Sequence, residues 1–453
     1  MHAIVRGPRF WRGLLYFLLA CPLFVSGPLP GFAAPLIVCW PRIHSGDEPH
    51  YLLMLTSLIQ DGDLDLANDY TAVHRGGLGA GRSFAGQPID HHVSWWIGGR
   101  LFYWWEFFEQ NPDRWKRDDN GHPVPTPKTR SAPSFLPPHE YSQHPPGLAM
   151  LLAPFAFPCR GTPCVESVAL IGTTVTVILG AVFFEALIAP FTISWQQRLT
   201  VTAIAFLGTP LWHYARTLFV EPYLATLCLG AYACTLRFRA FAWAGVLIGM
   251  GLLMKPPFAL LAIPLWGVCW ARRDYRGAII LTLPIVSAAL AILALNQFMH
   301  GSVLSSSIAW RSGNVLRGAM GLVFSPEHGL LPFSPSALLA IMTFRRFLAK
   351  HRRDGLVIAA GVVLYCSCMS LWIDWHGGHC FGPRMIVPVI PLLFVALCET
   401  PNLFWMQHAD GKVFAWTLVA GSVVFNGLGA FACGWAWSRH PLSFLSAWLG
   451  YGR

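Results

Sequence analysis

Apolar runs of about 15 to 25 residues recur along the whole chain, and this repetition limits the folds that the chain can adopt. A helix needs about 20 such residues to cross a bilayer, and fewer where neighbouring helices shorten the path. Only 12% of the residues are charged, about half the share in a soluble domain, which excludes a soluble globular enzyme. The sequence therefore predicts an all-α polytopic membrane protein, with one transmembrane domain over residues 1–453. It has about eleven spans (range about 10 to 13), at residues 14–38, 167–189, 199–214, 218–236, 240–254, 256–271, 277–298, 329–344, 355–373, 385–400 and 413–437.

The orientation follows from the positions of the basic residues. Arg6, Arg9 and Arg12 precede the first span, as in a signal peptide, but the ten later spans favour a retained anchor. With this N-terminus in the cytoplasm, most Arg and Lys residues of the short loops also lie inside, as the positive-inside rule expects. This topology requires that the apolar segment 145–158 does not cross the membrane. We predict a bacterial inner-membrane protein whose active face is extracytoplasmic.

The first extracytoplasmic loop, residues 40–145, is a long polar segment that we expect to be partly helical. It opens on the sequence Gly46-Asp47-Glu48-Pro49-His50-Tyr51 where the chain leaves the membrane. Two adjacent carboxylates at an interface are candidates for acid and base chemistry. The alternative is that they form an ordinary solvated N-terminal cap of a helix.

Further ionisable residues reach the same side from different spans. His144 precedes two prolines, Glu221 opens the fourth span, Lys255 ends the fifth and Arg384 begins the tenth. An ionisable group beside a span usually marks a functional site, although Lys255 and Arg384 could instead be interfacial anchors. Cations of this kind can neutralise a leaving phosphate, and Asp47 or Glu48 could activate an acceptor hydroxyl. The set suits transfer from a lipid-linked phosphate.

Metal binding is a competing interpretation of the histidines. His50, His91, His92, His144, His376 and His379 offer ligands, but they form no tight multi-ligand motif, so we predict neither a metal site nor a cofactor. Cys159 and Cys164 either form a disulfide or stay reduced, and the sequence favours neither state. Basic residues occur only in short clusters between apolar runs, which argues against nucleic-acid binding.

Several of these motifs, in this order, resemble the GT-C superfamily of membrane glycosyltransferases. They are 46–51, 144–147, Glu221-Pro222 and 249–256, and they are most similar to the bacterial branch related to protein O-mannosyltransferases and lipid A aminoarabinose transferases. Segments 321–330 and 377–384 resemble a less characterised subgroup of that branch.

The resemblance implies a polyprenyl- or dolichyl-phosphate sugar as donor and an active site at the outer membrane face. It implies that Asp47 is the catalytic base, with Glu48 as its neighbour. It assigns substrate binding to His50, Tyr51, His144, Glu221, Lys255 and Arg384. The aminoarabinose branch typically has Lys-Pro-Pro where this chain has His144-Pro145-Pro146, so the phosphate contact at that position is in doubt.

We therefore predict a membrane glycosyltransferase that moves a sugar from a polyprenyl-phosphate donor to an extracytoplasmic acceptor, which is a glycan, a lipid or a protein. Its other partners are the membrane lipids. One alternative is a transporter or flippase of a lipid-linked or anionic solute, which usually shows paired halves. We find no convincing internal repeat in the sequence. A second alternative is a structural membrane subunit whose outer loop only binds a partner.

Overall fold

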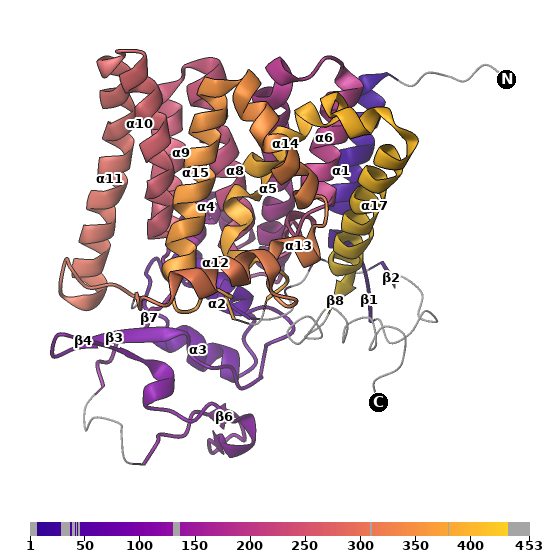
Figure 1. Ribbon diagram of the computed structural model, residues 1–453. Helices are drawn as coiled ribbons and strands as arrows, with labels where there is room; N and C mark the ends of the chain where they lie inside the picture. The colour runs from indigo at the N-terminus through magenta and orange to yellow at the C-terminus, as the bar shows by residue number, and fades with distance from the viewer. Residues whose placement is uncertain are drawn as a thin grey trace.

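The computed structural model describes residues 7–28, 37–38, 41, 43, 46–129, 136–308, 310–378 and 380–433. The described chain is mostly helical and has two layers (Figure 1). Long helices stand side by side in one layer. A smaller layer, formed by residues from 46 to 145, covers the end of the bundle that is opposite the N-terminus.

The bundle contains helices at the positions of the predicted spans. Its α-helices are α1 (Pro8–Phe24), α5 (Cys164–Ile188), α6 (Trp195–Leu207), α7 (Leu211–Tyr214), α8 (Val220–Ala233), α9 (Phe241–Met254), α10 (Ala262–Ala271), α11 (Tyr275–His300), α13 (Leu330–Phe333), α14 (Ala337–Lys350), α15 (Arg352–Leu371), α16 (Ile390–Phe394) and α17 (Ala409–Phe431). Tighter or wider turns extend several of them: η3 (Phe157–Cys159), η4 (Ala189–Phe191), η5 (Cys234–Phe238), η6 (Pro256–Leu261), η7 (Arg384–Val389), η8 (Val395–Asn402) and η9 (Phe404–Gln407).

Five helical segments among the described residues are long and apolar enough to cross a bilayer. They are Cys164–Phe191, Tyr275–His300, Arg352–Leu371, Arg384–Asn402 and Ala409–Phe431. The chain is thus a multi-pass, mostly helical membrane protein, whereas the count of eleven spans stays a prediction. The predicted spans 14–38 and 413–437 extend beyond the described residues.

The segment between the predicted outer loop and the second span forms a short helix. Helix α4 (Gly147–Ala156) has 10 residues, so it is too short to cross a bilayer by itself. Cys159 at the end of η3 and Cys164 at the start of α5 are both free thiols.

Helix α8 holds the centre of the bundle, because all 14 of its residues are buried. Small residues let the helices around α8 approach α8 and one another closely. A Cβ atom at Gly180 of α5 would lie 2.6 Å from the Thr226 hydroxyl of α8, and one at Gly245 of α9 would lie 2.3 Å from the Leu281 carbonyl oxygen of α11. This packing fixes the start of α8 and the end of α9, where two of the predicted site residues lie.

The smaller layer combines short helices and short strands. Its helices are α2 (Glu48–Gln60), α3 (Ala67–His74), η1 (Trp104–Glu106) and η2 (Pro112–Arg114), and its strands are β3 (Val93–Ile97), β4 (Arg100–Tyr103), β5 (Lys116–Arg117), β6 (Pro123–Val124) and β7 (Tyr141–Ser142). Strand β3 pairs antiparallel with both β4 and β7. Helix α12 (Val315–Phe324) lies beside this layer, and a separate small sheet joins β1 (Val25–Pro28), β2 (Ile37–Val38) and β8 (Ala432–Cys433).

Candidate active site

A polar cavity of about 280 Å³ lies between the two layers. Six of the eight predicted site residues line it: Asp47, Tyr51, His144, Glu221, Lys255 and Arg384. They come from the start of α2, the segment before α4, the start of α8, the end of α9 and the start of η7. The structure therefore brings these six distant residues together, and their individual roles stay predictions.

Asp47 reaches this cavity because of the backbone around it. Gly46 has φ +62°, a left-handed conformation that suits glycine, and a Cβ atom there would lie 3.4 Å from the Phe219 ring. Asp47 is the N-terminal cap residue of α2, and its carbonyl oxygen accepts hydrogen bonds from the backbone N–H groups of His50 and Tyr51. Its carboxylate does not cap the helix, which leaves it directed at other groups.

Arg384 connects the two acidic residues of the cavity. Its Nη2 atom lies 2.7 Å from Oδ2 of Asp47, and its Nε atom lies 3.1 Å from Oε1 of Glu221. Lys255 completes the group, with its Nζ atom 3.2 Å from the same Glu221 oxygen. The side chains of Lys255 and Arg384 are only 13% and 9% exposed. Interfacial anchors keep their charges in water, so this burial argues against that role.

Glu48 and His50 lie behind the cavity and do not line it. Glu48 is buried, and its Oε1 atom accepts a hydrogen bond of 2.8 Å from the backbone N–H of Leu218. The His50 ring stacks on His92, and its Nδ1 atom lies 2.9 Å from the hydroxyl of Tyr70. Glu48, predicted as the neighbour of the catalytic base, and His50, predicted to bind substrate, therefore do not line the cavity, and their roles stay predictions.

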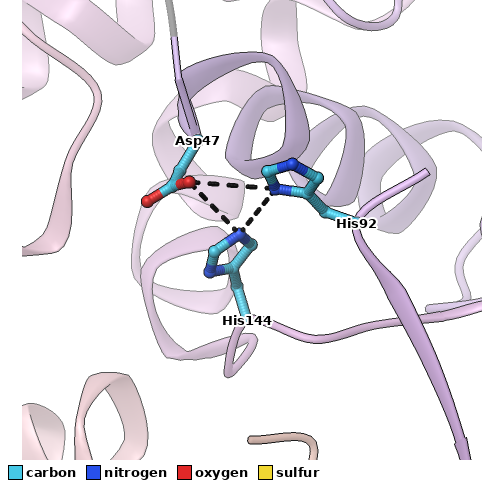
Figure 2. A group of neighbouring side chains, drawn as sticks. All are labelled: Asp47, His92 and His144. Carbon is cyan, nitrogen blue, oxygen red and sulfur yellow. Dashed lines mark hydrogen bonds and ion pairs between the residues drawn. The ribbon is translucent and has the colours of Figure 1, made fainter. Parts of the chain in front are cut away.

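Two histidines approach the carboxylate of Asp47 (Figure 2). Nδ1 of His92 and Nε2 of His144 each lie 3.8 Å from its Oδ1 atom, and they lie 3.2 Å from one another. This is a group of donors that could hold a metal ion. His144 was a predicted site residue, whereas nothing in the sequence distinguished His92 from the other histidines. His379, another ligand considered from the sequence, lies outside the described residues.

The charges around Asp47 set its protonation state. Burial alone would raise the pKa of the Asp47 carboxyl, but the positive charge of Arg384 is close enough to hold this pKa below its ordinary value. Burial lowers the pKa of His92 to about 4 and also lowers that of His144. Asp47 is therefore a carboxylate at neutral pH, and both imidazoles are uncharged.

Aromatic and polar residues that were not among the predicted site residues also line the cavity. The rings of Tyr103 and Trp105 stack at 4.3 Å, and both residues line the cavity, as do Arg311 and Asp374. In the sequence, the only indication of Tyr103 and Trp105 was that they belong to the aromatic-rich segment 102–108. Nothing in the spacing connects that run to Asp47, because the pairing of β3 with β4 brings it there.

A second, mostly apolar cavity of about 440 Å³ adjoins the first. Its wall includes apolar side chains of α9, η6 and α11, among them Leu252, Leu260 and Ile292. Five residues line both cavities: Pro145, Lys255, Pro256, Ile308 and Trp372. The Lys255 side chain thus stands at the junction of a polar chamber and an apolar one.

No protein-family model matches this chain, and no curated protein matches it by sequence. Solved structures do resemble it. ArnT from Cupriavidus metallidurans in the apo state superposes with a TM-score of 0.53 at 12% identity, over 98% of this chain and 76% of that one. The same protein bound to undecaprenyl phosphate gives 0.50 at 14% identity, with the same coverage.

A third structure extends the likeness to another enzyme. The apo oligosaccharyltransferase from Archaeoglobus fulgidus gives a TM-score of 0.50 at 9% identity, over 95% of this chain and 57% of that one. At such identities the likeness concerns the fold. It shows that this chain shares the fold of ArnT and of this oligosaccharyltransferase.

Proposed function

We propose that this protein transfers a sugar from a polyprenyl-phosphate donor to an extracytoplasmic acceptor, and that Asp47 is the catalytic base. The observation that carries the proposal is the junction of the two cavities at Lys255. A lipid-linked sugar phosphate needs an apolar place for its chain, a cation for its phosphate and a polar place for its sugar. The apolar cavity, Lys255 and the polar cavity would supply these three in that order.

The apolar cavity suits the prenyl chain of the donor. At about 440 Å³ it holds part of such a chain, and the remainder would extend into the membrane. Undecaprenyl phosphate binds to ArnT, whose fold this chain shares, and this supports a donor of the same class here.

The phosphate would lie near Lys255 and Arg384. Both cations are held by Glu221, and Arg384 is also held by Asp47. A donor phosphate can replace part of these contacts, because Arg offers a planar fork of donors and Lys offers a compact positive charge. Glu221 then keeps the two cations near one another.

In the reaction, an acceptor hydroxyl oxygen forms a bond with the anomeric carbon of the sugar. Asp47 takes the proton of that hydroxyl. The bond between the anomeric carbon and the phosphate oxygen breaks, and its electron pair stays on the phosphate. The negative charge that develops there is stabilised by Lys255 and Arg384, so the leaving group needs little protonation.

The proposal places the active layer outside the cytoplasm of a bacterial cell, at the inner membrane. The smaller layer and the start of α1 lie at opposite ends of the bundle (Figure 1). The basic N-terminus and the basic residues at the end of α14 favour the cytoplasm by the positive-inside rule. This leaves Asp47 on the outer side.

The test is the release of free polyprenyl phosphate by the purified protein in lipid nanodiscs. The protein receives a panel of polyprenyl-phosphate sugars, with crude envelope extract as acceptor. We expect release from one donor, and a loss of about 10²-fold or more in Asp47→Asn, because the amide cannot accept the proton. Asp113→Asn, at an exposed turn that does not line the cavity, is the matched control and should keep full turnover.

Two results would contradict the proposal. If no donor releases polyprenyl phosphate although the protein is folded, transport becomes the better hypothesis, and a lipid-translocation assay would follow. If release is the same in Asp47→Asn and in wild type, the reaction does not use Asp47 as its base.

A further inference from the structure

Three potential metal ligands converge at the edge of the polar cavity from segments that are distant in sequence. Asp47 precedes α2, His92 precedes β3, and His144 follows β7 (Figure 2). Within 4.8 Å of one another they present a carboxylate oxygen and two imidazole nitrogens. Two histidines and one carboxylate are a common donor set for Zn²⁺ and related divalent metals.

The spacing of the three atoms matches the size of such an ion. The sides of the triangle formed by Oδ1 of Asp47, Nδ1 of His92 and Nε2 of His144 are 3.8, 3.8 and 3.2 Å. The centre of a triangle with these sides is about 2.1 Å from each corner. This is the length of a bond from zinc to an imidazole nitrogen or to a carboxylate oxygen, about 2.0–2.2 Å.

The surrounding residues hold the three ligands in place. Oδ2 of Asp47 is bound by Arg384, which leaves Oδ1 directed at the two histidines. The ring of His92 stacks on the ring of His50 at 3.6 Å, and its backbone N–H donates to the hydroxyl of Tyr70. Outer contacts of this kind orient the ligands of metal sites.

Nearby charges do not forbid a cation. The two positive charges of Arg384 and Lys255 are balanced by the two negative charges of Asp47 and Glu221, so these four groups carry no net charge. Asp47 and His144 both line the polar cavity, so a bound ion would have an open side toward it. An open coordination position is typical of catalytic rather than structural sites.

We propose that Asp47, His92 and His144 form a binding site for one divalent transition metal, with Zn²⁺ as the best match to the donors. This departs from the sequence prediction of no metal, because only the fold brings His92 to the other two. Any role of the ion in sugar transfer rests on the proposed function, but its binding does not. When bound, such an ion would lower the pKa of a coordinated hydroxyl or water; Asp47 would then be a ligand of the ion, so its proposed role as base applies to the metal-free protein.

The site can be tested by binding alone. The full-length protein is purified in detergent without a histidine tag, stripped with a chelator and titrated with Zn²⁺, and bound metal is measured by mass spectrometry. Co²⁺ is then added as a spectroscopic probe, because its visible absorption reports imidazole and carboxylate ligation. We expect about one ion per chain, with an affinity reduced at least tenfold in His92→Gln and in His144→Gln.

The control variant is His139→Gln. This histidine belongs to the same layer, is 61% exposed and contacts Asp65. It should keep the metal and the cobalt spectrum of wild type. Circular dichroism and thermal unfolding of every variant identify losses caused by misfolding.

Binding of less than one ion, or equal binding by wild type and by a folded His92→Gln His144→Gln double variant, would overturn the metal site. Polyprenyl-phosphate release by metal-free protein would in that case leave the proposed function standing. Metal binding that depends on His92 and His144 supports the site, even if no donor tested is cleaved.

Discussion

Asp69 is a buried carboxyl in the smaller layer, outside the candidate active site. It is 7% exposed, and its Oδ2 atom has no hydrogen-bond partner among the described residues. Burial, aided by the negative charge of Asp61, raises the pKa of Asp69 to about 7. The folded state therefore holds this proton more tightly than the unfolded state, in which the pKa is about 3.9. The stabilisation is complete below about pH 4 and is lost as the pH rises through about 7.

Asp69→Asn should remove this dependence, because the amide stays neutral at every pH. We expect the variant to unfold at a higher temperature than wild type at pH 8, by about 2 °C for about 1 kcal/mol. At pH 4 the two proteins should unfold at the same temperature. The measurement is thermal unfolding in detergent at pH 4, 6 and 8, with Asp113→Asn as an exposed control. A constant difference across this range would show that the carboxyl does not titrate as described.

At the scale of elements, the sequence predicted most of the helices and part of the site. Long apolar runs mark helices such as α5 and α11 directly, because burial in lipid requires them to be apolar along their length. The direction of a side chain is harder to predict. Asp47 and Glu48 are adjacent in sequence, but one lines the cavity and the other binds the backbone of Leu218. The position of His92 beside Asp47 depends on the pairing of β3 with β7, and no local sequence pattern specifies that pairing.

The contact between α4 and α9 positions two site residues, and it depends on a glycine. A Cβ atom at Gly147 would lie 2.5 Å from the backbone carbonyl oxygen of Leu253, near the end of α9. His144 lies just before this contact, and Lys255 lies just after it. Gly147→Ala should separate the helices, cost about 1–3 kcal/mol of stability and reduce sugar transfer.

The matched control is Gly267→Ala in α10, where no described atom lies within 4 Å of the added methyl group. This variant should keep wild-type activity and equal or greater stability, because alanine favours a helix. Thermal unfolding and polyprenyl-phosphate release measure both effects. Equal behaviour of the two variants would show that the approach of α4 to α9 does not hold the site together.

At the scale of the whole molecule, the bundle and the smaller layer together form the candidate site, which neither forms alone. The apolar cavity is built mainly by the bundle, whereas the polar one needs residues of both layers. The sequence predicted the side on which these residues gather, but not the apolar cavity, because its wall comes from packing among α9, η6 and α11. If the apolar cavity holds the prenyl chain of the donor, a bulky side chain in this cavity should weaken the binding only of ligands with long prenyl chains.

Ala259→Trp places a bulky ring in the wall of the apolar cavity. We expect the affinity of this variant for undecaprenyl phosphate to fall about tenfold, which is about 1.4 kcal/mol of binding free energy. Its affinity for a short-chain prenyl phosphate should stay near that of wild type, because Lys255 and Arg384 are unchanged. Ile204→Trp fills a separate apolar cavity between α6 and α17 and should affect neither ligand. Native mass spectrometry of the detergent-solubilised variants gives both affinities, and equal losses for long and short chains would place the prenyl chain elsewhere.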